Sequence, residues 1–382
     1  MLLARRPFGG LARTKNLLLR APQTKLLRHQ CRGLCSLVRP LYEDEERRLG
    51  LDRQPYARDA FIKRFGAAEW ERAAGRRFVE LRYDTDGEAY SKREVLDYWS
   101  KSGSDRDGVP YEYWDACRHF AHKTTILLKE QTNITQIVAI HRKYHPGLDD
   151  IHLATCWHRI GVMASKSPAE RRWLQHNKPE LDVLQKHTIA MLPLFDAQGI
   201  SNAAYGIART GMRGSPSWTD MLDAIAKAAL PKVRDFKPQE SSNTVWAYAT
   251  SGHAAPELFD AIAKAAAPKV RDFDPQAFSN TVWAYATSGH AAPELFDAIA
   301  KAAAPKVRDF DPQALSNTVW AYATSGHAAP ELFDAIAKAA VPKVRDFDLQ
   351  ALRQTEWAYA KSGHQAPVLL EAISKATAKR KG

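Results

Sequence analysis

The chain has 382 residues, of which 45% are hydrophobic and 26% are charged, and its formal net charge is +12 at pH 7. This length fits a folded protein of about two domains. No run of about 18 apolar residues occurs, which excludes a membrane-spanning helix.

The positive charge is concentrated at the N-terminus. Residues 1–40 contain nine Lys and Arg residues and no Asp or Glu, so this segment supplies +9 and leaves +3 for the rest of the chain. An Arg-rich, acid-free segment with leucines at helical spacing is typical of an organellar transit peptide. We therefore predict import into an organelle, with the mitochondrial matrix as first choice and the chloroplast as the alternative. A basic nucleic-acid-binding arm is the other interpretation of this segment.

The four cysteines give no sign of a disulfide framework or a metal site. Cys31 and Cys35 lie in the predicted transit peptide, and Cys117 and Cys156 have no partner at a metal-binding spacing. The latter two are predicted to be small buried hydrophobic residues in a reducing compartment.

Residues 41–118 have a mixed composition that predicts a small α/β module. The segment 76–84, RRFVELRYD, has the composition of a strand, and TDGE follows it as a turn. Ser91 and Glu94 then form a capping-box pattern before a predicted helix.

A period of 37 residues dominates the C-terminal half. Two aromatic series follow it, a Trp series (Trp246, Trp283, Trp320 and Trp357) and a Phe series (Phe236, Phe273, Phe310 and Phe347). Residues 195–211 are a diverged copy with Tyr205 in the Trp position, and 153–161 are a more degenerate copy centred on Trp157. A period of about 20–50 residues indicates a solenoid or a propeller. We place tandem repeats at 195–382 and a degenerate helical repeat region at 119–194.

Helical signals favour a solenoid. In the unit that begins at Asp311, an N-cap and a Pro at the first helical position precede apolar residues at i, i+4 and i+7 from Leu315. Gly326 ends this helix, and Pro330 starts a second helix, which Pro342 ends or kinks. Such hairpins bury their apolar faces only by stacking. The predicted fold is an all-α solenoid of about five αα-hairpin repeats, wound as a right-handed superhelix, with the α/β module before it.

The repeat frame resembles a known family. The segment 310–337 and its copies are similar to the octotricopeptide-type (OPR-like) repeats of algal organellar RNA-maturation and translation factors. The shared motif is FDPQALSNTVWAYA…G…P.LFDAIA. The resemblance covers 195–382 well and 130–194 weakly, and it implies RNA binding on a concave face. Many members of that family end in a small α/β RAP-type domain. The chain stops at its last repeat, so we expect that domain to be absent.

The resemblance also implies that polar residues on the first helix of each unit meet nucleotides, with one unit for each base. Asn317 and Thr324 lie seven residues apart and away from the apolar stripe. The whole candidate set on first helices is Asn243, Thr250, Asn280, Thr287, Asn317, Thr324, Gln354 and Lys361. The alternative is that the Asn residues cap a helix or bond to the neighbouring helix.

The net charge of the repeat units does not favour RNA binding. A unit such as 274–310 has a net charge of −1, which makes it a poor RNA binder unless its charges separate by face. The recurrent PKVRD segment supplies Lys306 and Arg308 as candidate phosphate contacts, and the last unit adds Arg353. The alternative is that PKVRD is a solvated connector with local ion pairs.

Two further series are predicted to be structural. The Trp side chains could stack on bases, but Val and Ala flank them, so we predict that Trp246, Trp283, Trp320 and Trp357 form the repeat core. His253, His290, His327 and His364 are predicted to be turn residues. Packed helices lie about 8–10 Å apart, too far for successive histidines to share a zinc ion. We predict no metal site and no cofactor.

No Gly-rich phosphate loop, nucleophile elbow or paired His/Cys spacing occurs, so we predict neither catalysis nor a small-molecule substrate. The expected function is an organellar protein that binds single-stranded RNA and supports transcript processing, stability or translation, with other RNA-processing proteins as further candidate partners. The alternative is a protein–protein interaction scaffold that uses the same groove. A third hypothesis is a repeat array still drifting after duplication.

Overall fold

The computed structural model describes residues 47–49, 55–72, 81–83, 89–91, 118–214 and 216–380. The predicted transit peptide and Cys117 lie outside these residues. The chain divides into two compact units, one made of 1–45 and 79–120 and the other of 46–78 and 121–382. Among the described helices, none is long and apolar enough to cross a bilayer.

Short elements precede residue 120. In the first unit, β3 (Leu81–Tyr83) pairs antiparallel with β4 (Ala89–Ser91) and with β5 (Arg118–His119). In the second unit, β1 (Arg47–Leu49) pairs antiparallel with β2 (Pro55–Ala57), which is followed by α2 (Arg58–Phe65) and α3 (Ala67–Arg72). Ser91 is the last residue of β4, and the predicted helix after it lies outside the described residues. Because these pieces are divided between the two units, they give no support to a single α/β module at 41–118.

Helices fill the described residues from 120 to 379. Those of the degenerate region are α6 (Phe120–Glu130), α7 (Ile134–Tyr144), α8 (Asp150–Lys166), α9 (Pro168–His176) and α10 (Lys178–Met191), with 3₁₀ turns η3 (His145–Gly147) and η4 (Leu192–Leu194). The repeats contain first helices α11 (Ala197–Arg209), α13 (Pro238–Ser251), α15 (Pro275–Ser288), α17 (Pro312–Ser325) and α19 (Leu349–Ser362). Their second helices are α12 (Pro216–Ala229), α14 (Pro256–Ala266), α16 (Pro293–Ala303), α18 (Pro330–Ala340) and α20 (Pro367–Lys379). The connectors η5 (Leu230–Asp235), η6 (Ala267–Asp272), η7 (Ala304–Asp309) and η8 (Val341–Asp346) join one hairpin to the next.

The start and stop signals of the repeat are confirmed in the unit of α17 and α18. The side chain of Asp311 accepts a hydrogen bond from the backbone N–H of Ala314 at 2.7 Å, and Pro312 is the first helical residue. Gly326 follows the helix with φ of +67°, a left-handed conformation that favours glycine, and Pro330 begins α18. Local chemistry therefore sets the ends of both helices.

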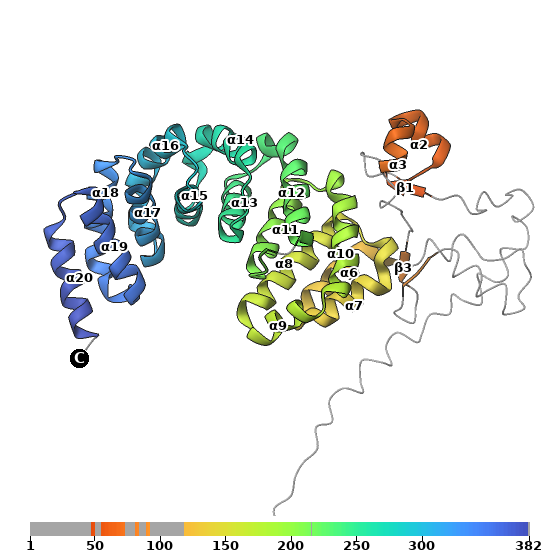
Figure 1. Cartoon of the computed structure of the whole chain (residues 1–382), viewed down its shortest axis with the longest axis horizontal. Coiled ribbons are helices and arrows are strands. Elements are labelled where there is room, and N and C mark those ends of the chain that lie inside the picture. The colour runs from red at the N-terminus through yellow and green to blue at the C-terminus, as the bar shows by residue number, and fades with distance from the viewer. Residues whose placement is uncertain are drawn as a thin grey trace, which may run out of the picture. The chain divides into compact units, whose positions relative to one another are not determined.

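Successive first helices form one layer, and successive second helices form another. The first helices α8, α11, α13, α15, α17 and α19 pack against each other far more extensively than the second helices do. In Figure 1 the first helices lie on the inner side of the curve that the row of hairpins describes. Small buried residues such as Ala284 and Ala321 let them approach closely. The predicted helical repeat solenoid is confirmed, whereas its handedness stays a prediction.

Each unit is tied to the preceding one by contacts that recur with the repeat. The buried hydroxyl of Tyr322 donates to the carbonyl of Phe296 at 2.8 Å, and a ring nitrogen of His327 lies 2.9 Å from a carboxylate oxygen of Asp297. The same contacts are made by Tyr248, Tyr285 and Tyr359, and by His253, His290 and His364. Burial raises the pKa of Tyr322, and the Asp297 carboxylate raises it further, so the hydroxyl keeps the proton that it donates. The His series consists of turn residues, as predicted.

Candidate functional site

A stripe of incompletely buried side chains crosses the first helices. In α17, Asn317, Trp320 and Thr324 occupy positions i, i+3 and i+7, which share one helix face, while most residues between them are buried. We call these three positions of every first helix the inner stripe. The equivalents are Asn243, Trp246 and Thr250 in α13, Asn280, Trp283 and Thr287 in α15, and Gln354, Trp357 and Lys361 in α19. The predicted Asn and Thr positions therefore lie on one face, and that face stays accessible.

The Trp series belongs to the inner stripe and not to the interior of the core. Trp246, Trp283 and Trp320 are half-buried and pack one side against the core, while Trp357 is 44% exposed. The tyrosine two residues later on the same helix, such as Tyr322, is fully buried. The prediction of a Trp core is thus wrong for Trp357 and too strong for the other three. The physical reason is that one residue turns a helix by about 100°, which moves Trp320 away from the buried apolar stripe.

The stripe continues into the degenerate copies. In α11 it consists of Asn202, Tyr205 and Arg209, and in α8 of Thr155, His158 and Val162. The rings of His158 and Tyr205 are stacked with centroids 6.1 Å apart, and Tyr205 lies 5.1 Å from Trp246. His158 therefore occupies the Trp position of α8, and the prediction of Trp157 was one residue off. Trp157 is buried, and its indole N–H donates to Thr188 Oγ1 at 2.8 Å.

In the units of α13, α15 and α17 the acidic residues lie away from the stripe, whereas α19 carries the exposed Glu356 directly before Trp357. Helices α15 and α17 contain no charged residue, and the only one in α13 is the buried Glu240, which accepts from the backbone N–H of Lys237. In the unit 274–310, Asp274 caps α15, Glu294 and Asp297 lie on α16, and Asp309 ends η7. The charges of this net-negative unit are therefore separated by element, which leaves the inner stripe neutral and polar.

Positive groups stand toward the two ends of the stripe. Arg209 donates to the Tyr205 hydroxyl at 3.0 Å and to Ser165 Oγ at 2.6 Å, and the exposed Arg213 donates to the carbonyl of Thr250 at 2.5 Å. Lys361 is exposed at the other end. Burial lowers the pKa of His158, and nearby Arg209 and Arg159 lower it further, so its ring is neutral at pH 7. The sequence reasoning missed Arg209 and Arg213, although Arg209 occupies the Thr position of its unit.

The predicted phosphate contacts do not gather with the inner stripe. The Lys306 ammonium donates to the carbonyls of Arg271 (2.7 Å) and Phe273 (3.2 Å) in the preceding unit. Lys269 and Lys343 make the equivalent contacts one unit away on either side. Lys306 is therefore reassigned from an RNA contact to an inter-unit tie. Arg308 is exposed in its connector, and Arg353 is exposed at the position where the preceding unit buries Ser316.

The Asn positions are close enough to interact between units. Gln354 Nε2 donates to Asn317 Oδ1 at 3.3 Å, which is the helix-to-helix contact that the alternative interpretation of the Asn series expects. The Thr250 hydroxyl is buried and has no hydrogen-bond partner in the described chain. The Asn317 side chain is therefore oriented by the neighbouring helix, and the Thr250 hydroxyl is not accessible to an external ligand in this conformation.

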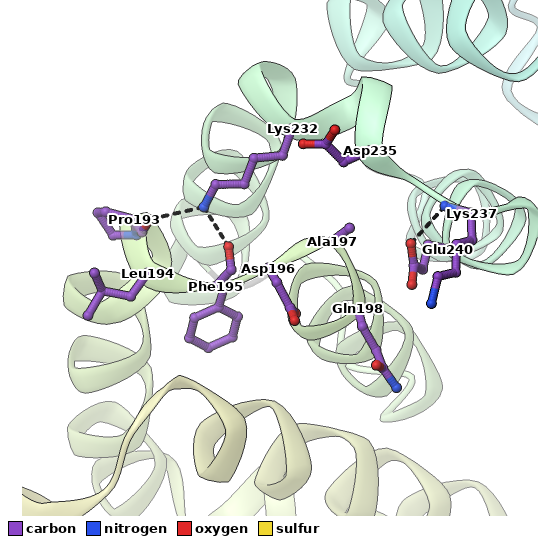
Figure 2. A pocket seen from close by; sticks show the side chains of 10 residues that line it. All are labelled: Pro193, Leu194, Phe195, Asp196, Ala197, Gln198, Lys232, Asp235, Lys237 and Glu240. Carbon is purple, nitrogen blue, oxygen red and sulfur yellow. Dashed lines mark hydrogen bonds between the residues drawn. The ribbon is translucent and has the colours of Figure 1, made fainter. Parts of the chain in front are cut away.

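A groove of about 410 Å³ opens where η4 and α11 meet η5 and α13. The spacing from Phe195 to Phe236 is 41 residues here instead of 37. Figure 2 shows the Lys232 ammonium reaching the carbonyls of Pro193 (3.0 Å) and Phe195 (2.5 Å), while Asp196 caps α11. Since these polar groups serve the chain itself, we interpret the groove as a junction between units.

Three histidines of the degenerate region form a second cluster. His141 on α7, His145 in η3 and His187 on α10 each present a ring nitrogen, and these nitrogens all lie within 4.8 Å of one another. The sequence reasoning missed this cluster and predicted no metal site. The His141-to-His145 spacing of four residues was the available signal, but His187 lies 46 residues after His141.

Comparison with known proteins gives two matches. The family model of the RNA-editing substrate-binding complex 6 protein matches residues 221–380. A RAP domain-containing chloroplastic protein of Oryza sativa subsp. japonica is 27% identical over 125 residues, which are 32% of this chain and 19% of that relative. The chain thus spans less than a fifth of this relative's length. Together the two matches indicate a similarity to RNA-associated helical-repeat proteins.

Proposed function

We propose that the inner stripe binds single-stranded RNA in an organelle and thereby supports transcript processing, stability or translation, without a catalytic step of its own. The observation that carries this proposal is the neutral polar and aromatic stripe, repeated every 37 residues on α13, α15 and α17. Amide and hydroxyl groups can read base edges, and a half-exposed Trp ring can stack on a base. The name of the matching family supports an RNA ligand. The name of the rice relative supports an organellar location and favours the chloroplast.

The charge distribution predicts how such binding depends on salt. Phosphate contacts would come from Arg209, Arg213 and Lys361, toward the ends of the stripe, whereas the middle units would contribute mainly stacking and hydrogen bonds. Each neutralised phosphate contributes a slope of about −0.7 to log K against log salt for a single strand. We therefore expect a shallow salt dependence, corresponding to about two to four phosphates.

The test is selection of short single-stranded RNAs by the full chain at two salt concentrations. Because Asn243, Asn280 and Asn317 occupy the same position of near-identical units, three adjacent units should prefer the same base, and RNAs with a run of three identical bases should be enriched. The triple variant Asn243→Ala, Asn280→Ala, Asn317→Ala should lose this enrichment and stay folded.

A matched control removes one negative and one positive charge from the outer layer. The double variant Glu294→Gln, Lys301→Gln changes two exposed residues of α16 and leaves the net charge unchanged. It should select the same RNAs as the wild type. If the triple variant selects the same RNAs as the wild type, the inner stripe does not read bases.

The second candidate is a protein-interaction scaffold. The 44% exposure of Trp357 and the lack of charge on α15 and α17 suit an apolar-anchored peptide as well as a base. If no RNA is retained at either salt concentration, and Trp357→Ala abolishes capture of an organellar protein, this second function would replace the first.

A further inference from the structure

We infer that His141, His145 and His187 form a binding site for one late first-row transition-metal dication, with Zn²⁺ as first choice. The site lies in the degenerate repeat region, outside the inner stripe, and it does not depend on RNA binding.

The geometry brings one nitrogen of each ring toward a common point. His141 is in the last turn of α7 and His145 follows four residues later in η3, so both rings lie on one side of the chain. His187 reaches them from α10, and His141 Nε2 is 3.1 Å from His187 Nδ1. Tetrahedral coordination with metal–nitrogen bonds of about 2.0–2.1 Å separates the nitrogens by roughly 3.3 Å. All three separations lie within 4.8 Å, so ring rotations that bring the remaining two toward 3.3 Å would place the three nitrogens around one ion.

A hydrogen bond alone accounts for only part of the cluster. The 3.1 Å contact uses one donor and one acceptor of two neutral imidazoles. The third ring, His145, packs against both of the others, with centroids 4.1 Å from His187 and 5.1 Å from His141. Gathering three imidazoles where two are buried costs desolvation, and a shared cation would engage a lone pair on each ring.

The donor set selects the class of metal. Three neutral imidazoles suit Zn²⁺, Cu²⁺, Ni²⁺ or Co²⁺, whereas Mg²⁺ and Ca²⁺ require oxygen ligands. Burial, together with a smaller effect of neighbouring histidines, lowers the pKa of both His141 and His187 to about 3, so both rings are neutral and keep a lone pair at neutral pH. Three protein ligands leave a fourth position for water or an external ligand. The ion would tie α7 to α10 across the degenerate region.

The experiment titrates the full chain, prepared without a histidine tag and stripped with a chelator, with Co²⁺ and then Zn²⁺. One equivalent of Co²⁺ should bind with the visible absorption of a low-coordinate nitrogen site, and Zn²⁺ should displace it. Binding should also raise the thermal midpoint. His187→Gln and His145→Gln should each weaken binding by about tenfold or more.

Two controls keep the result interpretable. His176→Gln removes an exposed histidine of α9 whose ring contacts the carbonyl of Arg172, and it should leave metal affinity unchanged. Circular dichroism of each metal-free variant separates lost binding from lost folding, and His145, which is only half-buried, is the substitution less disruptive to the core. Absence of stoichiometric binding to the wild type, or equal affinity in His145→Gln and His176→Gln, would overturn the site.

Discussion

Several exposed side chains of the repeat are constrained because they bind the neighbouring unit. The side chain of Asp297 is 64% exposed, yet its carboxylate lies 2.9 Å from the ring nitrogen of His327 in the next unit. Lys306 is half-exposed, yet its ammonium donates hydrogen bonds to two backbone carbonyls of the preceding unit. The contacts between units explain why the same residue recurs at these exposed positions in successive units. Thr324 is exposed on the inner stripe, where it is accessible to an external ligand.

Substitution of Lys306 tests whether this residue serves the fold or RNA. Lys306→Met should lower the free energy of unfolding by about 1.5 kcal/mol, because charged hydrogen bonds to two carbonyls are lost. RNA affinity should stay within twofold of wild type, as measured by a filter-binding titration.

Lys301→Met on the exposed face of α16 is the matched control, since it removes the same charge without an inter-unit contact. Its stability in urea should lie within about 0.5 kcal/mol of wild type. Equal stabilities for both variants, together with reduced RNA binding only for Lys306→Met, would restore Lys306 as an RNA contact.

At the scale of elements, the closest approach is between α8 and α11. A Cβ on Gly206 would lie 2.2 Å from the carbonyl oxygen of Trp157, and a Cβ on Gly161 would lie 2.2 Å from that of Gly206. Two glycines in facing positions thus allow the helices to touch through their backbones. The regular units have Ala at the positions that correspond to Gly206, whereas the junction of α8 and α11 has no room for a Cβ there.

Gly206→Ala should therefore destabilise the chain by about 3 kcal/mol or more, because the clash is with backbone that only a shift of a whole helix relieves. Gly326→Ala is the comparison: its Cβ would meet nothing within 4 Å, and only the left-handed backbone is penalised, by about 1–2 kcal/mol. Chemical unfolding followed by circular dichroism measures both. A smaller loss for Gly206→Ala than for Gly326→Ala would show that α8 and α11 are farther apart than described.

At the scale of the whole molecule, the array should tolerate removal of one period. Deleting residues 274–310 brings Asp311 next to Phe273, and the contacts of Tyr322, His327 and Lys343 then find identical partners in the preceding unit. We expect a folded chain with a sharp thermal transition and a midpoint within a few degrees of wild type. Its preferred run of identical bases should also shorten by one.

Deleting only residues 293–310 is the contrasting experiment. It removes α16 and η7, so α15 loses its hairpin partner and the inter-unit contacts lose their register. This variant should show a broad transition and faster proteolysis. If deletion of residues 274–310 gives an equally broad transition and equally fast proteolysis, the units do not stack independently.

The helices of the regular repeats could be predicted from the sequence because their signals are local. Asp311, Pro312 and Gly326 act within a few residues of themselves, and the apolar spacing from Leu315 defines which face is buried. The same rules failed for the Trp series, since a residue at the edge of an apolar stripe is buried or exposed according to how closely the next helix packs. In α8, where the repeat has diverged, the register was missed by one residue for the same reason.

The sequence by itself determined the all-helical repeat architecture, the ends of the helices and the polar identity of the inner stripe, because capping, proline and periodicity act over one or two helical turns. Only the tertiary structure decided where the charges lie, that Lys306 binds carbonyls 33 and 35 residues before it, and that His141 meets His187. Such contacts depend on the rise and rotation from one hairpin to the next. That geometry comes from packing, and no local pattern of residues specifies it.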